Sequence, residues 1–371
     1  MAVVLFETLP IKTGGAIGVA TLNVEKTLNS LSLEMIDLLT PQLELWETDN
    51  RVKLVMLQGA GDRAFSAGGD IQSLYHSMVE HPEGPNPYAD AFFEREYRLD
   101  YLIHNYPKPV VVWAHGFVMG GGLGVMAACS HRIGTEKTRI AMPEITIGLF
   151  PDAGATWMCR QMETHWAYFL AWTGSQVNGP DAQHLHFVDH LIDHKLKSDF
   201  IETLQQADWS SGIEATLLNI IGNFEGESEA MPDRELPGHE KLIKAIIEKC
   251  LRSDNPVQTF ADCAGQLTGD RWLEKSAKNF QGGSPTTAQI IHQQLQRSKS
   301  MTLKETFLFE LIIAVQCSRH PDFVEGIRAL LIDKDNNPVW AYPEMGQVPD
   351  NWIEAHFKAP WPDHPLADLV G

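Results

Sequence analysis

Cysteine is scarce in this sequence, and its five cysteines lie apart from one another without a CxxC pair. Structural zinc sites and disulfide frameworks both need cysteines at close, repeated spacings. The scattered, odd-numbered set therefore argues against zinc and favours a reducing compartment. The first residues, MAVVLFETLP, carry no basic leader and run at once into strand-like sequence. We therefore expect no targeting peptide and a cytoplasmic location.

Basic residues are also few, because 29 Lys and Arg stand against 48 Asp and Glu and give a formal net charge of −19. This charge opposes the binding of a polyanion, so we expect no nucleic-acid partner. A small anionic ligand is still compatible with it where a local basic group or free backbone N–H groups meet the anion. No run of 18 apolar residues occurs, so we expect no membrane span.

Signature motifs of several ligand classes are missing as well. The Gly-rich stretch Met119–Gly124 has Val125 where a dinucleotide fingerprint needs its third glycine, and no GK[ST] follows. Four histidines crowd one short segment, at spacings that could align three of them on a helix: His184, His186, His190 and His194. No HExxH motif accompanies them, so we expect no metal site.

The sequence does contain the composition and periodicity of a large globular protein. Hydrophobic residues make up 44% and charged residues 21% of 371, enough for one large domain or two. Residues 16–23 and 52–59 read as buried strands, and 33–49 read as a helix whose course near Pro41 is uncertain. Units of two strands and a helix recur at a spacing of roughly 40–50 residues. From about residue 240 the pattern is mainly helical.

Two Gly-rich turns lead directly into predicted helices. They are Phe65–Ile71 (FSAGGDI) and Met119–Gly124 (MGGGLG). The free N–H groups at such a helix start suit a developing negative charge. Taken singly, each turn is better explained by simpler roles, namely helix capping by Asp70 and close glycine packing against a strand.

Two acids interrupt the apolar segment AMPEITIGLFPDAG, in which seven residues separate Glu144 from Asp152. A single buried acid is more often a paired structural group than a catalyst. Two acids shortly after two candidate oxyanion turns change this balance. Burial and like-charge proximity should raise at least one of their pKa values, which suits acid–base chemistry near neutral pH.

The motifs SAGGDI, HGFVMGGGLG and AMPEITIGLFPDAG, in this order, resemble the crotonase (enoyl-CoA hydratase/isomerase) superfamily. The segments EKTLNSLS, SPTT and DFVEGIRALLIDKDNNPVW are similar to one branch of it, the 3-hydroxyisobutyryl-CoA hydrolases of valine catabolism. The resemblance covers nearly the whole chain, and the order of the motifs is more specific than any one of them.

The resemblance implies an α/β fold, a spiral of repeated ββα turns followed by a helical C-terminal region. We place the spiral, with the catalytic site, in residues 1–200 and the helical region in residues 201–371. The resemblance also implies an acyl-CoA thioester whose carbonyl oxygen lies between two backbone N–H groups. Matching the motifs places these donors at Gly69 and Gly121.

The resemblance also separates hydrolysis from hydration. Hydratases of the family use two glutamates, and the position of the first is Gly124 in this chain, whereas Glu144 matches the second. Asp152 stands where hydratases commonly have glycine, and Glu96 matches a substrate-contacting glutamate of the hydrolases. These matches imply that Glu144 acts as nucleophile or general base, while Asp152 and Glu96 orient the substrate hydroxyl or a water.

The coenzyme A moiety needs contacts of its own on this acidic chain. The candidates are backbone and cationic groups of the matching segments: Lys26, Ala67, Gly68, Asp70, Arg328 and Lys334. The cations among them are equally explained as solvated surface residues. Coenzyme A is part of the substrate, so we expect no separate cofactor, and a homo-oligomer is compatible with the superfamily.

Two other functions stay open at this point. The first is an enoyl-CoA hydratase or isomerase on the same fold, against which Gly124 argues. The second is a non-catalytic acyl-CoA-binding protein. The retained acids argue against this second alternative, because a binder gains nothing from burying charged groups.

Overall fold

The computed structural model describes residues 2–82 and 84–370, and the chain forms two compact units. Each unit combines three separate segments: Met1–Gly69, Leu99–Ile140 and Val177–Glu235 in the first, and Asp70–Arg98, Ala141–Gln176 and Leu236–Gly371 in the second. The division predicted at residue 200 therefore differs from the observed one. Segments of the N-terminal half pack with the C-terminal helices, so the two units alternate along the chain.

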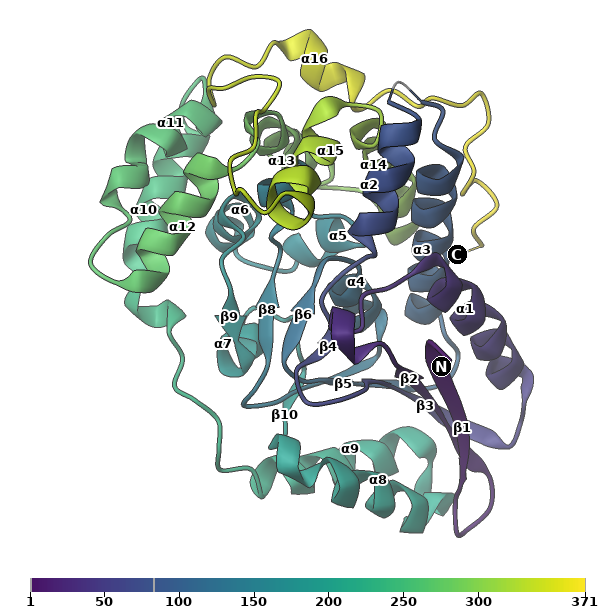
Figure 1. The fold of residues 1–371 in the computed structure, drawn as a ribbon. Helices are drawn as coiled ribbons and strands as arrows, with labels where there is room; N and C mark the ends of the chain where they lie inside the picture. The colour runs from purple at the N-terminus through teal and green to yellow at the C-terminus, as the bar shows by residue number, and fades with distance from the viewer. Residues whose placement is uncertain (1, 83, 371) are drawn as a thin grey trace. The chain divides into compact units, whose positions relative to one another are not determined.

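The first unit contains the two sheets, and Figure 1 labels most of their strands. The six-stranded sheet has the order β1 (Val4–Pro10), β2 (Ala16–Leu22), β3 (Val52–Gly59), β5 (Val110–Ala114), β7 (His131–Gly134) and β10 (His190–Leu191). The four-stranded sheet has the order β4 (Ala64–Ser66), β6 (Phe117–Met119), β8 (Arg139–Ala141) and β9 (Val177–Asn178). In the larger sheet only β1 and β2 are antiparallel, and the neighbours from β2 to β10 run parallel.

The predicted repeat of two strands and a helix is confirmed. In the pairs β3/β4, β5/β6 and β7/β8, the first strand joins the larger sheet and the second joins the smaller one. A helix or a short 3-10 turn follows each pair: α2 (Ile71–Glu80), α4 (Gly120–Ala128) and η2 (Glu144–Ile147). The chain thus winds as a crotonase-like spiral, and each turn of the spiral ends at one of the motifs identified in the sequence.

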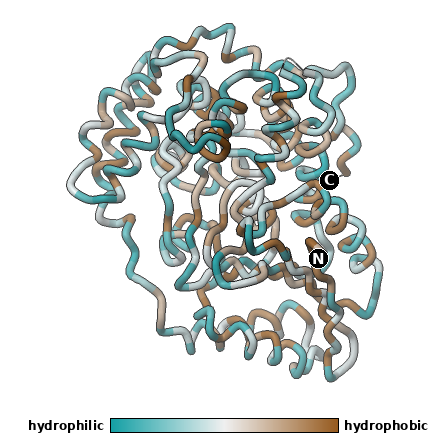
Figure 2. Tube along the Cα trace, in the orientation of Figure 1, coloured by the Kyte–Doolittle hydropathy of each residue, from teal (hydrophilic) through white to brown (hydrophobic). Residues whose placement is uncertain are grey.

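The core of the first unit explains why its strands are so apolar. Alternate residues of the larger sheet face one way, and they pack on α8 (Lys197–Gln206) and α9 (Ile213–Gly226), as in Trp113 against Phe200. Figure 2 shows hydrophobic residues following the strands, whereas these two helices alternate between hydrophobic and hydrophilic positions. Burying each large apolar side chain stabilises the fold by about 1.5–3 kcal/mol.

The remaining elements of the first unit are short or line its edges. They are η1 (Glu25–Thr27), α1 (Leu33–Thr48), α7 (Gly179–His184), η3 (His194–Leu196) and η4 (Trp209–Ser211). Helix α1 continues through Pro41, at which the sequence left its course uncertain. Its start is secured by Ser32, whose side chain accepts a hydrogen bond from the Met35 N–H at 3.2 Å. Packing of the buried face therefore outweighs the single backbone bond that the proline removes.

The second unit is helical, as the sequence predicted for the C-terminal part. Besides α2 and η2 it contains α5 (Ala155–Cys159), α6 (Thr164–Thr173), η5 (Leu236–Gly238), α10 (Glu240–Leu251), α11 (Pro256–Cys263), η6 (Ala264–Gln266), α12 (Arg271–Gly282), α13 (Pro285–Arg297), α14 (Leu303–Cys317), α15 (Pro321–Ile327), the π-helix η7 (Arg328–Ile332) and α16 (Asp350–Ala355). Helix α3 (Pro87–His104) begins in this unit and ends in the first. Helix α14 begins with a capping box formed by Thr302 and Glu305. No helix among the described residues has the length and apolar character that a membrane span requires.

Candidate active site

The two Gly-rich turns of the first unit are neighbours in space. Strands β4 and β6 run parallel, so the chain leaves both at the same edge of the smaller sheet. Gly68, with φ +110°, adopts a conformation that favours glycine, and its α-carbon faces the start of α4. A Cβ on Gly68 would lie 3.4 Å from the carbonyl oxygen of Met119. The turn is tied down by Leu31, whose N–H donates to the Gly68 carbonyl at 2.8 Å.

Glycine at the start of α4 permits this close approach. A Cβ on Gly122 would lie 2.6 Å from the Cβ, the Oγ and the carbonyl oxygen of Ser66, closer than real Cβ contacts. Gly121 lies in the first turn of α4, where backbone N–H groups have no acceptor within the helix. The tight packing that the sequence left as an alternative is therefore real. It also holds the amide of Gly121 at the helix end that favours negative charge.

The second unit gathers the three predicted acids into one buried cluster. Glu144 opens η2, Asp152 lies in the loop before α5, and Glu96 lies on α3. Their exposed fractions are 4%, 7% and 2%, respectively. Ile145 fixes η2 in the core, since it is fully buried and its carbonyl accepts from the Ser284 N–H at 3.0 Å. The cluster is therefore built into the packing of this unit.

The hydrogen bonds of the acid cluster are incomplete. Tyr97, which follows Glu96 on α3, donates from its hydroxyl to Oδ2 of Asp152 at 2.7 Å. Among the described residues, Oε1 of Glu96 and Oε2 of Glu144 are buried and have no hydrogen-bond partner. Buried polar atoms are normally paired, because leaving one unpaired costs about 1–3 kcal/mol. These two oxygens are therefore the groups of the cluster that are suited to bind a polar substrate atom.

Burial and mutual repulsion shift the pKa values of the cluster upward. Burial is the main reason that the pKa of Glu144 lies well above its ordinary value, and the nearby charge of Asp152 raises it further. The pKa of Glu96 is raised by burial and by the charges of Asp152 and Glu310. Burial also raises the pKa of Asp152 to about 6, although the hydrogen bond from Tyr97 opposes this shift. Each of the three acids therefore keeps its proton to a higher pH than an ordinary carboxyl group does.

Two further members of the cluster were missed in the sequence. Tyr97 sits beside Glu96 in FEREYRL, and Glu310 is the single acid in the apolar stretch FLFELIIAV. Burial raises the pKa of Glu310 to about 8, while backbone N–H groups of the α5 start act in the opposite direction. A lone acid in an apolar helix is the same signal that singled out Glu144 and Asp152, so Glu310 could have been found.

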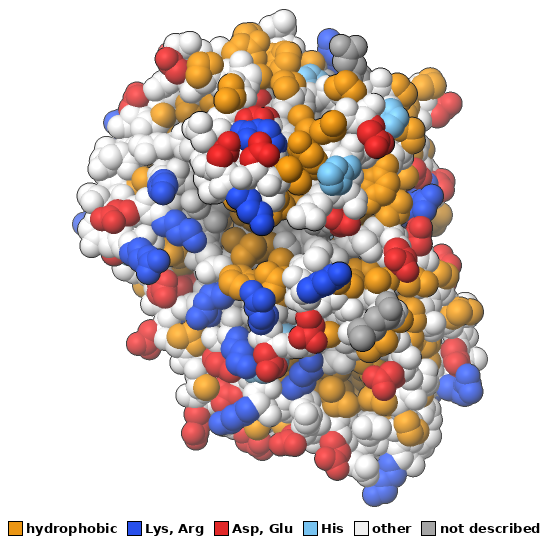
Figure 3. Space-filling model, in the orientation of Figure 1, with side chains coloured by type: hydrophobic (Ala, Val, Ile, Leu, Met, Phe, Trp, Pro, Cys, Tyr) orange, Lys and Arg blue, Asp and Glu red, His pale blue; other side chains and the backbone are white. Residues whose placement is uncertain are grey.

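The residues predicted to contact coenzyme A differ in their surroundings, because some are hydrogen-bonded within the chain and others are exposed. Asp70 caps α2, since its carboxylate accepts from the Ser73 N–H at 3.2 Å and from the Ser73 hydroxyl at 2.7 Å. The Ala67 N–H donates to the Leu28 carbonyl at 3.0 Å. Lys26 on η1 and Lys334 after η7 are both exposed. On the face shown in Figure 3, several Lys and Arg side chains stand close together although the chain is acidic overall.

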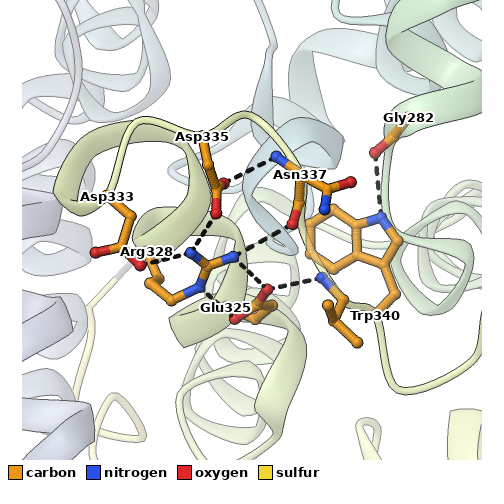
Figure 4. Close-up of polar contacts among 8 residues, drawn as sticks. Gly282, Glu325, Arg328, Asp333, Asp335, Asn337 and Trp340 are labelled. Atoms are coloured by element: carbon orange, nitrogen blue, oxygen red, sulfur yellow. Dashed lines mark hydrogen bonds and ion pairs between the residues drawn. The ribbon is translucent and has the colours of Figure 1, made fainter.

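Arg328, one of the predicted coenzyme A contacts, forms ion pairs within its own segment. Its guanidinium binds three carboxylates, those of Glu325 at 2.8 Å, Asp333 at 2.6 Å and Asp335 at 2.8 Å, as Figure 4 shows. The same guanidinium donates to the Asn337 carbonyl at 3.3 Å. These partners raise the pKa of Arg328. These bonds hold the loop after η7, and a contact between Arg328 and a coenzyme A phosphate stays a prediction.

The crowded histidines do not share one helix. They fall on α7, the turn after it, β10 and η3, and His190 instead meets Glu225 at 3.1 Å. A different group among the described residues, Glu163, His165 and Glu240, has ligand atoms within 4.8 Å of one another. The ammonium of Lys244 lies 3.6 Å from the Glu163 carboxylate and supplies a positive charge there.

The fold and the order of these motifs define a class of protein. The enoyl-CoA hydratase/isomerase family model matches residues 17–357, so the chain belongs to this family. Solved structures agree with this assignment. A carnitinyl-CoA dehydratase from Mycobacterium thermoresistibile is 29% identical, with a TM-score of 0.84 and 98% coverage of both chains. An enoyl-CoA hydratase from Rhodobacter sphaeroides 2.4.1 is 27% identical, with a TM-score of 0.81 and coverage of 96% and 97%.

Curated relatives within the family carry a more particular name. Mitochondrial 3-hydroxyisobutyryl-CoA hydrolase of Homo sapiens is 34% identical over 353 residues, which are 95% of this chain and 89% of the relative. The protein of the same name from Danio rerio is 33% identical over 96% of this chain and 89% of its own length. Both relatives are mitochondrial, so the prediction of a cytoplasmic location is contradicted. Cysteine usage and the first residues were insufficient grounds for it.

Proposed function

We propose that this protein hydrolyses the thioester of a short 3-hydroxyacyl-CoA, with 3-hydroxyisobutyryl-CoA as the preferred substrate. The observation that carries the proposal is the buried acid cluster, in which Glu144 keeps an unpartnered oxygen beside Asp152. Gly124 supports hydrolysis over hydration, since it occupies the position of the first hydratase glutamate. The choice of acyl group rests on the relatives that are named 3-hydroxyisobutyryl-CoA hydrolase.

The proposed reaction has two steps. The Glu144 carboxylate attacks the thioester carbonyl, the C–S bond breaks, and coenzyme A leaves as a thiolate with a thiol pKa near 8.5. Water then hydrolyses the resulting mixed anhydride, which releases the acid and restores Glu144. In the alternative route Glu144 removes a proton from the attacking water. In both routes the N–H groups of Gly69 and Gly121 stabilise the negative charge that develops on the carbonyl oxygen.

The other acids act on the 3-hydroxyl group and the water. In the proposal Asp152 and Glu96 accept hydrogen bonds from the substrate hydroxyl and from the hydrolytic water. The unpartnered Oε1 of Glu96 supports this role. Coenzyme A arrives with the substrate, so the reaction uses no further cofactor. Backbone groups of Ala67, Gly68 and Asp70 and the ammonium groups of Lys26 and Lys334 stay predictions for its contacts. A homo-oligomer also stays a prediction.

A panel of acyl-CoA thioesters tests the proposal and its substrate. We expect thiol release from 3-hydroxyisobutyryl-CoA to exceed that from isobutyryl-CoA by on the order of 10⁴-fold in kcat/KM, because the analogue leaves buried carboxylates unpaired. Glu96→Gln should narrow this ratio, whereas the rate with isobutyryl-CoA should change little. Loss of the crotonyl-CoA double-bond absorbance would instead establish a hydratase. Tight acyl-CoA binding without thiol release would establish a non-catalytic binder.

The raised pKa values predict the pH dependence of the reaction. A carboxylate that must be ionised loses its charge as the pH falls through its folded pKa, so kcat/KM should fall as the pH drops through the raised pKa of Glu144. Asp152→Asn removes a charge that raises the pKa of Glu144 and Glu96. The acidic limb of the normalised profile should therefore move to lower pH in this variant. If the acidic limb of Asp152→Asn lies at the same pH as that of the wild type, the charge of Asp152 does not raise the pKa of the reacting acid.

A further inference from the structure

The loop that carries Asp152 has a backbone that its surroundings must hold in place. Ala153 has φ +53° and Gly154 has φ +85°, both in the left-handed region. For a residue with a side chain, such as Ala153, this conformation costs roughly 1–2 kcal/mol. It persists only where neighbouring groups fix the loop. Side chains of α13 and α14 in the second unit do so.

Glu310 holds the loop from one side. This residue of α14 is fully buried, and its Oε2 accepts from the Gly154 N–H at 2.7 Å while its Oε1 accepts from the Thr156 N–H at 2.9 Å. Both oxygens thus bind the backbone at the start of α5, two and four residues after Asp152. A buried carboxylate with both oxygens committed to the backbone is a strong and directional clamp.

Gln294 on α13 holds the loop from another side. Its Nε2 donates to the Pro151 carbonyl at 2.7 Å and to the Thr156 hydroxyl at 2.6 Å. The exposed fraction of Gln294 is 1%, so water does not compete for these bonds. Residues on both sides of Asp152 are therefore fixed by α13 and α14, and Tyr97 fixes the carboxylate itself.

We propose that Glu310 and Gln294 are positioning residues that hold Asp152 in its productive orientation. The inference rests on the proposed role of Asp152 in the hydrolase reaction. Glu310 also acts on the cluster through its charge. The titratable groups in electrostatic contact with it come from α3, the Asp152 loop and α5: Glu96, Tyr97, Asp152 and Cys159. A neutral residue at position 310 therefore weakens the clamp, and it also removes the charge that Glu310 carries above its pKa of about 8.

The first test is the Glu310→Gln variant, which keeps the size of the side chain but sets an amide NH₂ against one backbone N–H. We expect kcat for 3-hydroxyisobutyryl-CoA to fall by on the order of 10–100-fold, with KM within about threefold of the wild-type value. Because its pKa is about 8, Glu310 carries little charge at pH 7 and below, so the acidic limb of the pH profile should stay close to its wild-type position. Gln294→Met removes both of the Gln294 hydrogen bonds and no ionisable group, so it should likewise lower kcat without moving that limb.

A matched control separates positioning from general stability. Glu305→Gln lies in the first turn of the same helix and weakens its capping box, in which Glu305 binds Thr302 rather than the Asp152 loop. It should lower the melting temperature and leave kcat unchanged. In the Asp152→Asn background, Glu310→Gln should cause little further loss, since the group it positions is already absent. Additive losses, or wild-type kcat in folded Glu310→Gln and Gln294→Met, would overturn the proposal.

Amide hydrogen exchange tests positioning without substrate. Protection of the Gly154 and Thr156 amides should fall at least tenfold in Glu310→Gln, while peptides of α12 keep their wild-type exchange. Unchanged protection would overturn the clamp. If the loop loosens as expected but the wild-type protein releases no thiol from any 3-hydroxyacyl-CoA, the clamp stands and the proposed function fails. The two failures can therefore be told apart.

Discussion

Replacing Glu144 with Gln is expected to lower thiol release from 3-hydroxyisobutyryl-CoA by on the order of 10³–10⁴-fold. The amide can neither attack the thioester carbonyl nor accept a proton from water. The Gln side chain has nearly the same shape as Glu and should be equally buried. KM and the affinity for a non-hydrolysable acyl-CoA analogue should therefore stay within about threefold of the wild-type values. The measurement is thiol release under saturating substrate, together with calorimetric titration of the analogue.

Protein stability provides the control for this variant. Glu144 has its pKa raised in the folded state, so the folded protein binds more protons than the unfolded chain. At pH values above the ordinary carboxyl pKa, the ionised form therefore disfavours folding, and this unfavourable contribution is absent in Glu144→Gln. The variant should melt at or above the wild-type temperature at pH 7. A large loss of stability would indicate that Glu144 is a structural acid.

Gly122→Ala is expected to lower kcat by on the order of 100–1000-fold, the effect of losing one oxyanion donor. The added Cβ would lie 2.6 Å from Ser66, so the start of α4 must move away from the end of β4. This movement displaces the Gly121 amide from its place beside the Gly68–Gly69 turn. The overpacking should cost about 1–3 kcal/mol of folding free energy, which leaves a folded protein for kinetic analysis.

Gly222→Ala is the matched control for this prediction. Gly222 lies within α9, and a Cβ there would meet no atom within 4 Å. The same substitution in an open helical position should raise stability by up to about 1 kcal/mol and leave kcat unchanged. If folded Gly122→Ala turns over at the wild-type rate, the α4 amide is not an oxyanion donor.

The parts of the fold that depend on local sequence were predictable. Strands such as 52–59 are continuous apolar runs, and glycine turns such as 68–69 mark the points at which the chain leaves the sheet. Each signal lies within a few residues, which is the range that periodicity and turn chemistry report. Glu144 and Asp152 were also identified, because carboxyl groups stand out in an apolar segment, whereas Glu96 was found only through the resemblance to the hydrolases.

The features that the sequence did not reveal depend on long-range packing. Glu310 bonds to Gly154, 156 residues away in the chain, and no local pattern records that meeting. The division into two units has the same origin, since segments 70–98 and 141–176 fold with the C-terminal helices. Arg328 is a different case. Its partners Asp333 and Asp335 follow within seven residues, so the nearby acids could have indicated an internal ion-pair cluster.

The most direct test of the account is a single-turnover reaction with enzyme in excess over 3-hydroxyisobutyryl-CoA, in which free thiol and released acid are both measured. The wild-type protein should yield the two in equal amounts, and Glu144→Gln should bind the substrate and yield neither on the same timescale. Thiol release by Glu144→Gln at the wild-type rate would contradict the central role of this carboxylate. A wild-type protein that leaves the thioester intact would contradict the hydrolase function itself.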